Sequence, residues 1–154
     1  MIRPGEYLQQ YKRKLRLVSV DLFDTLVTRT FARPTDLFYE LEKQLIPEEE
    51  KFICFARERI ESEFQLREEK DFRQEVTLDE IYARLQTKLL LSPEQIQEAQ
   101  KRELQLEEQS IMPIRQTVAM IKAVKDAIRV ILVSDTYLPE VFIARVLEKK
   151  TSGK

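Results

Sequence analysis

The 154-residue sequence contains no histidine, and this absence excludes several kinds of site. Ser–His–Asp triads, histidine general bases and histidine metal ligands all require an imidazole. The single cysteine, Cys54, cannot form a disulfide within the chain or a cysteine-rich zinc site. Without a histidine to activate its thiol, we expect Cys54 to pack on the flank of a helix rather than to act as a nucleophile.

Glycine is nearly as scarce, since the chain has only Gly5 and Gly153. A glycine-rich phosphate loop needs several glycines within a few residues, so neither common type of such loop fits this sequence. The charges almost cancel, with 26 basic and 27 acidic side chains and a net charge of −1. This balance indicates no basic surface for nucleic acid. Chemistry would therefore come from carboxylates, hydroxyls, lysines or a bound hard metal ion.

Long apolar segments are also missing, because no run of the sequence reaches the ~18 residues that a membrane-spanning helix needs. We therefore expect a cytoplasmic protein whose partners include neither a membrane nor nucleic acid. The length of 154 residues favours a single domain with a core of its own.

Two short apolar runs, one near each end of the chain, are typical of strands. The first covers Leu15 to Val20, and the second, Val130 to Val133, is an uninterrupted aliphatic run. Continuous runs of this length favour strands that are buried on both faces of a parallel sheet. Helix-compatible sequence follows each run, as βα units require. The predicted fold class is α/β, dominated by helices.

The sequence between the two runs predicts a series of amphipathic helices. The segment "TLDEIYARLQTKL" opens with a capping-box pattern from Thr77 to Glu80. Ser92 and Pro93 are typical of the cap and first position of another helix. The apolar face of that helix is thin, so we expect it to be among the most exposed. Further helix starts are indicated at Pro34–Thr35, Pro47 and Pro113, the Pro47 helix carrying Ile53, Ala56, Ile60 and Phe64 at helical spacing.

The stretch "VSVDLFDTLVTR", residues 18 to 29, places acidic side chains at the end of the first predicted strand. The carboxyl end of a parallel sheet is where α/β folds bind ligands, and a carboxylate there can act as a nucleophile. Ser134 comes after the second strand in the same way. Either segment alone favours a simple turn or helix cap, formed by Asp21, Asp24 and Thr25 or by Ser134 and Asp135. Together, at matching strand ends, they favour a site.

These residues resemble the first two motifs of the haloacid dehalogenase (HAD) superfamily. "VSVDLFDTLV" is similar to its first motif, a strand followed by D-x-x-x-T, and "VILVSD" to its second, a strand ending in Ser or Thr. The two segments also resemble predicted hydrolases that are sometimes joined to glycosyltransferases. The resemblance implies a partial Rossmann-like core, residues 1–32 and 113–154. It also implies an inserted all-helical cap over 33–112, in which we expect no strand.

The resemblance also implies a role for each residue. Asp21 would be the nucleophile, and Thr25 would orient the turn. One carboxylate oxygen of Asp21 and the main-chain carbonyl of Phe23 would bind Mg²⁺, and Ser134 would hold the transferred group. The substrate would be a small phosphorylated or halogenated molecule. Asp21 and Ser134 are accordingly predicted to lie close together at the ends of adjacent parallel strands.

The sequence departs from the family pattern at two places. Phe23 stands where the phosphatases of the family carry an aspartate that protonates the leaving group. Asp24 stands where glycine is common, so we expect a structural role for it, with the leaving-group acid as the less favoured alternative. The chain after Ser134 has no room for the later strands and the acidic pair that complete the Mg²⁺ site. We therefore expect either the first part of a longer protein or a truncated form.

Two classes of function remain open. One is a Mg²⁺-dependent HAD-like hydrolase, of phosphatase or dehalogenase type, with an incomplete catalytic set and weak or no activity as the isolated chain. The other is a non-catalytic interaction module or regulatory fragment. An incomplete sheet with unpaired edges also predicts self-association or pairing with a completing chain.

Overall fold

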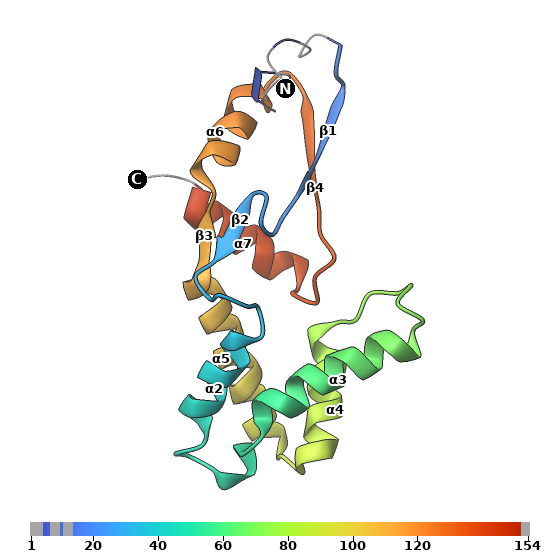
Figure 1. Ribbon diagram of the computed structural model, residues 1–154, viewed down its shortest axis with the longest axis vertical. Coiled ribbons are helices and arrows are strands. Elements are labelled where there is room, and N and C mark those ends of the chain that lie inside the picture. Colours follow the sequence, from blue (N-terminus) through green and yellow to red (C-terminus); the bar gives the residue numbers. More distant parts are fainter. Residues whose placement is uncertain (1–4, 7–9, 11–13, 152–154) are drawn as a thin grey trace.

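The computed structural model describes residues 5–6, 10 and 14–151, which form two lobes joined by a short antiparallel stem (Figure 1). These residues form six α-helices, a two-stranded parallel sheet and a two-stranded antiparallel sheet, which confirms the helix-dominated α/β class. None of these helices is long and apolar enough to cross a membrane. The elements are β1 (Leu17–Asp21), β2 (Val27–Arg29), α2 (Asp36–Leu45), the 3₁₀ helix η1 (Glu50–Phe52), α3 (Phe55–Glu69), α4 (Leu78–Leu89), α5 (Pro93–Ser110), β3 (Ile111–Pro113), α6 (Arg115–Val124), β4 (Arg129–Val133) and α7 (Glu140–Thr151).

The upper lobe contains the parallel sheet, in which β1 pairs with β4 from Leu17 opposite Arg129 to Asp21 opposite Val133. One face of this sheet packs against α6 and α7 through an apolar cluster that includes Val20. The other face is open, with Leu17 47% and Val133 53% exposed. The prediction that both strands are buried on both faces is therefore wrong, because only one layer of helices covers the sheet.

The stem that joins the lobes is the antiparallel pair of β2 and β3. The Thr30 N–H extends the pairing by donating to the Ser110 carbonyl, at 3.0 Å. The chain enters the lower lobe after β2 and leaves it through β3. The expectation that 33–112 holds no strand is wrong for Ile111 and Met112, which pair in β3 because the chain must return beside its point of entry. From residue 33 to residue 110, every regular element is a helix.

The lower lobe is built from α2, α3, α4 and α5 around an apolar core. The predicted capping box of α4 is confirmed, since Thr77 and Glu80 bond reciprocally, and Ser92 forms a second capping box at the start of α5. The long helix expected from Pro47 is wrong: α3 begins only at Phe55. Cys54, directly before it, has the left-handed φ of 72°, through which a helix cannot continue. Cys54 therefore occupies the N-cap position of α3, without a side-chain capping hydrogen bond, rather than lying on a helix flank.

The prediction that the α5 helix is among the most exposed is wrong for a specific physical reason. The face of α5 that bears Ile96 and Ala99 continues through Glu103, Glu107 and Ser110, all of which are buried. A buried carboxylate is stable only when hydrogen bonds and opposite charges replace the water it loses. The buried face of α5 thus combines a few apolar side chains with the carboxylates of Glu103 and Glu107, which have partners elsewhere in the fold.

Glu103 is paired with Arg59 of α3 in the interior of the lower lobe. Arg59 donates to both carboxylate oxygens, at 3.0 and 2.8 Å, and the Tyr82 hydroxyl donates to Glu103 at 2.7 Å. The side chains of Arg59 and Glu103 are both fully buried. Burial would lower the pKa of Arg59, but the attraction and hydrogen bonds of Glu103 raise it above its ordinary value. The guanidinium is therefore held charged inside the protein.

Tyr137, in the loop after β4, brings the upper lobe into this network. Its ring lies under the Arg59 guanidinium, 4.6 Å from the ring centroid, and its hydroxyl donates to Glu107 at 3.1 Å. Its main-chain carbonyl accepts from the Leu78 N–H, at 3.1 Å, at the start of α4. Burial and the nearby carboxylates Glu103 and Glu107 raise the pKa of Tyr137, so its hydroxyl stays a donor. One residue thereby joins both lobes.

Removing Arg59 is expected to destabilise the protein strongly. Arg59→Ala would leave the buried Glu103 carboxylate without its counter-charge, and breaking such a pair typically costs about 3–5 kcal/mol. Arg57→Ala on the same helix is the matched control, because the Arg57 side chain is 69% exposed. Its unfolding midpoint should stay close to that of the wild type. Urea unfolding followed by circular dichroism measures both, and an equal effect of the two substitutions would contradict the network.

The capping carboxylate of Glu80 predicts how stability depends on pH. Hydrogen bonds from Lys70 and from the Thr77 N–H lower the pKa of Glu80 from 4.5 to about 2. The stabilisation is therefore fully present above pH 4.5 and is lost as the pH falls through about 2. Glu80→Gln keeps a capping side chain but removes the charge. The difference in urea midpoint between wild type and Glu80→Gln should shrink between pH 5 and pH 2.5, whereas Glu68→Gln, at an exposed carboxylate on α3, serves as the control.

Candidate functional site

Buried side chains before and after the turn that follows β1 hold this turn in place. Leu22, Leu26 and Val27 are almost fully buried in the core of the upper lobe. The N–H groups of Leu26 and Val27 both donate to the Leu22 carbonyl, at 2.9 and 3.0 Å. The alternation of apolar and polar residues in "DLFDTLV" thus anchors the turn from below and presents Asp21, Asp24 and Thr25 to solvent.

Asp21 is the last residue of β1, and its exposed carboxylate has a partner within the turn. The Thr25 hydroxyl donates to Asp21 Oδ2 at 3.2 Å. This bond restricts the rotation of the carboxylate and leaves its other oxygen available. The role expected of Thr25, to orient the turn, stays a prediction.

Asp24 occupies a backbone position that explains why its residue type matters. Its φ is 56°, in the left-handed region that glycine, asparagine and aspartate tolerate best. Its N–H donates to the Val27 carbonyl at 2.7 Å, and its carboxylate accepts from the Thr28 hydroxyl at 3.3 Å. These contacts place Asp24 within the hydrogen-bond pattern of the turn.

Ser134 comes directly after β4, one residue beyond the partner of Asp21 in the sheet. The parallel pairing confirms that Asp21 and Ser134 lie at the same end of adjacent strands. Asp21 is not among the residues that line the cavity beside Ser134, however. Ser134 lines a cavity of about 350 Å³ between β4 and α7. Asp21 stays on the open surface, so the sheet end is assembled but not enclosed.

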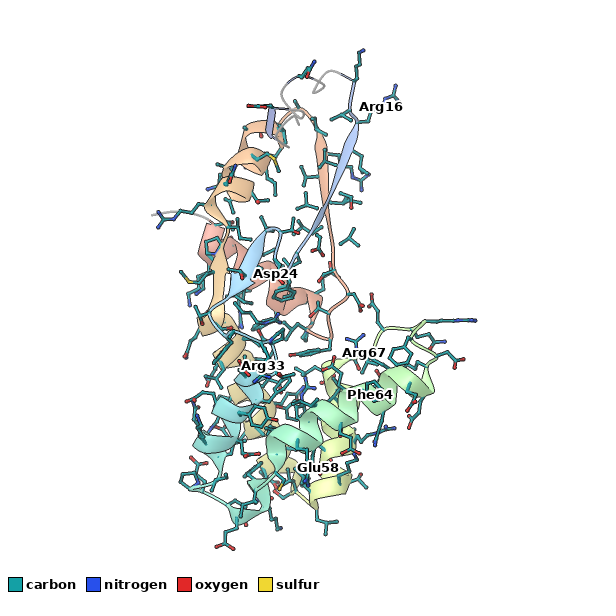
Figure 2. All side chains as sticks on the ribbon, in the orientation of Figure 1. Arg16, Asp24, Arg33, Glu58, Phe64 and Arg67 are labelled. Atoms are coloured by element: carbon teal, nitrogen blue, oxygen red, sulfur yellow. The ribbon has the colours of Figure 1, made fainter. Side chains whose placement is uncertain are left out.

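A larger cavity, of about 440 Å³, lies between the turn and the lower lobe. Figure 2 shows Asp24 on the upper lobe, with Arg67 and Phe64 of α3 on the lower lobe. The walls of this cavity combine apolar rings with two arginines and three carboxylates. They include Phe23, Asp24, Arg29, Phe38, Ile60, Glu63, Phe64, Arg67, Asp135 and Tyr137.

The two arginines of this cavity differ in how firmly they are held. Arg29 donates to both oxygens of the buried Glu107, at 2.9 and 3.1 Å, and stacks 3.8 Å over the Phe23 ring. Arg67 is held by Glu63 and reaches across to Asp135 of the upper lobe at 3.3 Å. Since the Asp135 side chain is 84% exposed, this last contact is the weaker one.

The oxygen donors at the sheet end suit a hard cation but do not complete its coordination. Asp21 supplies a carboxylate and Phe23 a main-chain carbonyl, the donor types that Mg²⁺ takes. Within the described part of the chain, no cluster of three or more Asp, Glu, Cys or His could hold a metal ion. Mg²⁺ usually keeps several waters and is bound by one or two carboxylates together with substrate phosphate, so a carboxylate and a carbonyl are donor types it takes.

Several residues around the site were not predicted from the sequence. Arg29, Arg67 and Tyr137 bind the two lobes together, yet each looks like an ordinary surface residue in its segment. One signal was present: Glu103 and Glu107 fall on the same helical stripe as Ile96 and Ala99. A carboxylate at a core position predicts a buried basic or hydroxyl partner.

Comparison with known proteins assigns no relative to this chain. No protein-family model matches the sequence, and no curated protein matches it either. The function is therefore inferred from the residues and their geometry.

The left-handed conformation of Asp24 predicts which substitutions the turn tolerates. Asp24→Asn should leave the unfolding free energy nearly unchanged, because asparagine adopts this conformation and keeps an acceptor for Thr28. Asp24→Val should cost about 1–3 kcal/mol, because a β-branched side chain is strained there. Thermal and urea unfolding of both variants measure the difference. Equal stability of the two variants would contradict the assigned backbone role.

Proposed function

We propose that this chain carries the nucleophile of a HAD-like hydrolase that uses an aspartate and Mg²⁺, in a partial Rossmann-like core with a helical cap. The observation that supports it is the parallel pairing of β1 with β4, which sets Asp21 and Ser134 at one end of the sheet. The Thr25–Asp21 hydrogen bond adds to this support, since it orients the carboxylate. Such a protein would act in the cytoplasm.

In the proposed reaction, the free carboxylate oxygen of Asp21 attacks the electrophilic phosphorus or carbon of the substrate. A new bond to that atom forms as the bond to the leaving group breaks, and the leaving group departs with the electron pair. Water then attacks the covalent intermediate and gives up a proton to the solvent, and the product is released with the Asp21 carboxylate restored. Ser134 would donate a hydrogen bond to the transferred group.

The groups that hold Mg²⁺ would be the Asp21 carboxylate and the Phe23 carbonyl. When bound, the ion would neutralise charge, so that an anionic nucleophile and an anionic substrate can approach one another. Because the described residues hold no cluster of three or more metal-ligating side chains, this ion would be held weakly by the chain alone. Weak or no turnover is expected for the isolated chain for this reason, although a single attack by Asp21 would still leave a covalent adduct.

The residues beside Asp21 restrict the leaving group. The Phe23 ring is stacked under Arg29 and has no proton to give, and the Asp24 carboxylate is engaged with Thr28. A leaving group that needs no protonation, such as a halide or an acidic phenol, therefore fits better than an alkoxide. Substrates of this kind are halogenated acids and aryl phosphates.

A non-catalytic interaction module is the second candidate. It is favoured by the exposure of Asp21 and by the absence of Asp21 from the walls of the cavity between the lobes. In that case the helical lobe would bind a partner, and the acidic turn would serve only to join β1 to β2.

The two candidates differ in whether Asp21 becomes covalently modified. The chain is incubated with p-nitrophenyl phosphate or a 2-haloacid, with and without Mg²⁺, and quenched in acid for intact-mass measurement. The hydrolase proposal predicts an adduct on the wild-type chain and its loss in Asp21→Asn. Such a substitution preserves the side-chain volume, so folding should be unchanged.

Asp126→Asn is the matched control, because Asp126 is exposed in the turn before β4, at the opposite end of the sheet. This variant should form the adduct as the wild type does. An adduct that persists in Asp21→Asn would rule out aspartate nucleophilic catalysis. A folded wild-type chain that forms no adduct with either substrate would favour the interaction module.

A further inference from the structure

The outer edge of β4 is a strand edge with its backbone groups free for pairing. β1 occupies the other edge, and no other strand of the described residues pairs with β4. The Arg129 N–H donates toward β1, to the Arg16 carbonyl at 3.3 Å. Because successive residues of a strand direct their backbone groups to opposite edges, Val130 and Leu132 direct theirs outward. Unpaired edges of this kind are templates for another strand.

Apolar side chains remain exposed along the same edge. Leu132 is 45% exposed, and it lines an open groove of about 340 Å³ on the helix-covered side of the sheet. Val133, on the opposite side, is also exposed. The groove is lined by Leu26, Val118, Ile121, Lys122, Lys125, Val130, Leu132, Leu147 and Thr151. A strand placed beside β4 would cover both the backbone groups and these side chains.

We propose that the partner of this edge is a second copy of the chain, paired antiparallel through β4 about a two-fold axis at Leu132. In this register Leu132 faces its own copy, and Ile131 faces Val133. Arg129 of each copy then faces Asp135 of the other. The sequence "RVILVSD" is therefore self-complementary in charge as well as in apolar character.

Backbone geometry and charge select the same register. A residue pair joined by two hydrogen bonds in an antiparallel ladder needs both residues to direct their backbone groups toward each other. Leu132 with itself meets this condition, and Val130 with Ser134 meets it when pairing between the copies extends β4 beyond Val133 through Ser134 and Asp135. Arg129 and Asp135 then form a closely spaced pair without backbone bonds, where opposite charges stabilise and like charges destabilise. A shift by two residues keeps the backbone pattern but separates the charges.

Both charged residues are available for this contact. The Arg129 residue is exposed, and the Asp135 carboxylate is 84% exposed. The existing partner of Asp135 is Arg67, at 3.3 Å, which stays paired with Glu63 at 3.0 Å if Asp135 turns away. Moving Asp135 from Arg67 to Arg129 of the other copy therefore leaves no buried charge unpaired.

The result would be a four-stranded sheet in the order β1–β4–β4–β1, with the same surface contributed by each copy. The Ser134 main chain would lie at its margin, with the hydroxyl on the helix-covered side. This dimer does not depend on the proposed hydrolase function, because it rests on the strand edge and its charges alone.

Charge reversal with rescue tests the dimer. Light scattering after size-exclusion chromatography, over a series of chain concentrations, gives the mass and the dissociation constant. The wild-type chain should reach the mass of a dimer. Arg129→Asp should weaken the dimer on the order of tenfold or more, since both symmetric pairs become repulsive. The double variant Arg129→Asp with Asp135→Arg should restore it.

Arg73→Asp is the matched control, because Arg73 is an exposed cation of the lower lobe, and this variant should dimerise like the wild type. Circular dichroism confirms that each variant is folded. A wild-type chain that stays monomeric at every concentration would overturn the proposal. A dimer insensitive to Arg129→Asp, or one that the double variant fails to restore, would overturn it equally.

Discussion

The buried guanidinium of Arg59 is the constraint on which the rest of the structure depends. A charge without water must be paired on every side, and Arg59 meets this need with Glu103, with Glu63 at 3.0 Å, and with the rings of Phe38 and Tyr137. These partners come from α2, α3, α5 and the loop after β4. Burying this one charge therefore fixes the relative positions of three helices and a loop of the other lobe.

The hydrogen bonds and ring contacts around Arg59 extend through Tyr137 to the candidate site. Tyr137 is three residues beyond Ser134, and its hydroxyl shares Glu107 with Arg29, which in turn covers Phe23 beside Asp21. The strand ends are thus held by the sheet from one side and by buried charges of the helical lobe from the other. Arg67 and Asp135 add a contact that is exposed and therefore easily exchanged.

Local patterns in the sequence predicted the two strands, the acidic turn, the capping box of α4 and the Ser92 cap of α5, because each depends on residues close together in the chain. The adjacency of Asp21 and Ser134 was predicted from two similar strand ends. Local patterns could not predict the pairing of Arg59 with Glu103, 44 residues apart, or of Arg29 with Glu107, 78 residues apart. Without these partners α5 looked exposed. The break between Pro47 and α3, which contains η1, was not predicted, because nothing in the sequence indicates the left-handed φ of Cys54.

The loop bearing Ser134 and Tyr137 is docked on the helical lobe through buried contacts, and both the site and the lobe arrangement depend on this docking. The Leu78 amide reports it directly, because the first N–H groups of a helix have no partner inside it and this one donates to the Tyr137 carbonyl at 3.1 Å. Hydrogen exchange measured by NMR should find the Leu78 amide protected about as strongly as interior amides of α4, such as that of Leu85. A Leu78 amide that exchanges as fast as a solvent-exposed one, while Leu85 stays protected, would show that the lobes are not docked in this way.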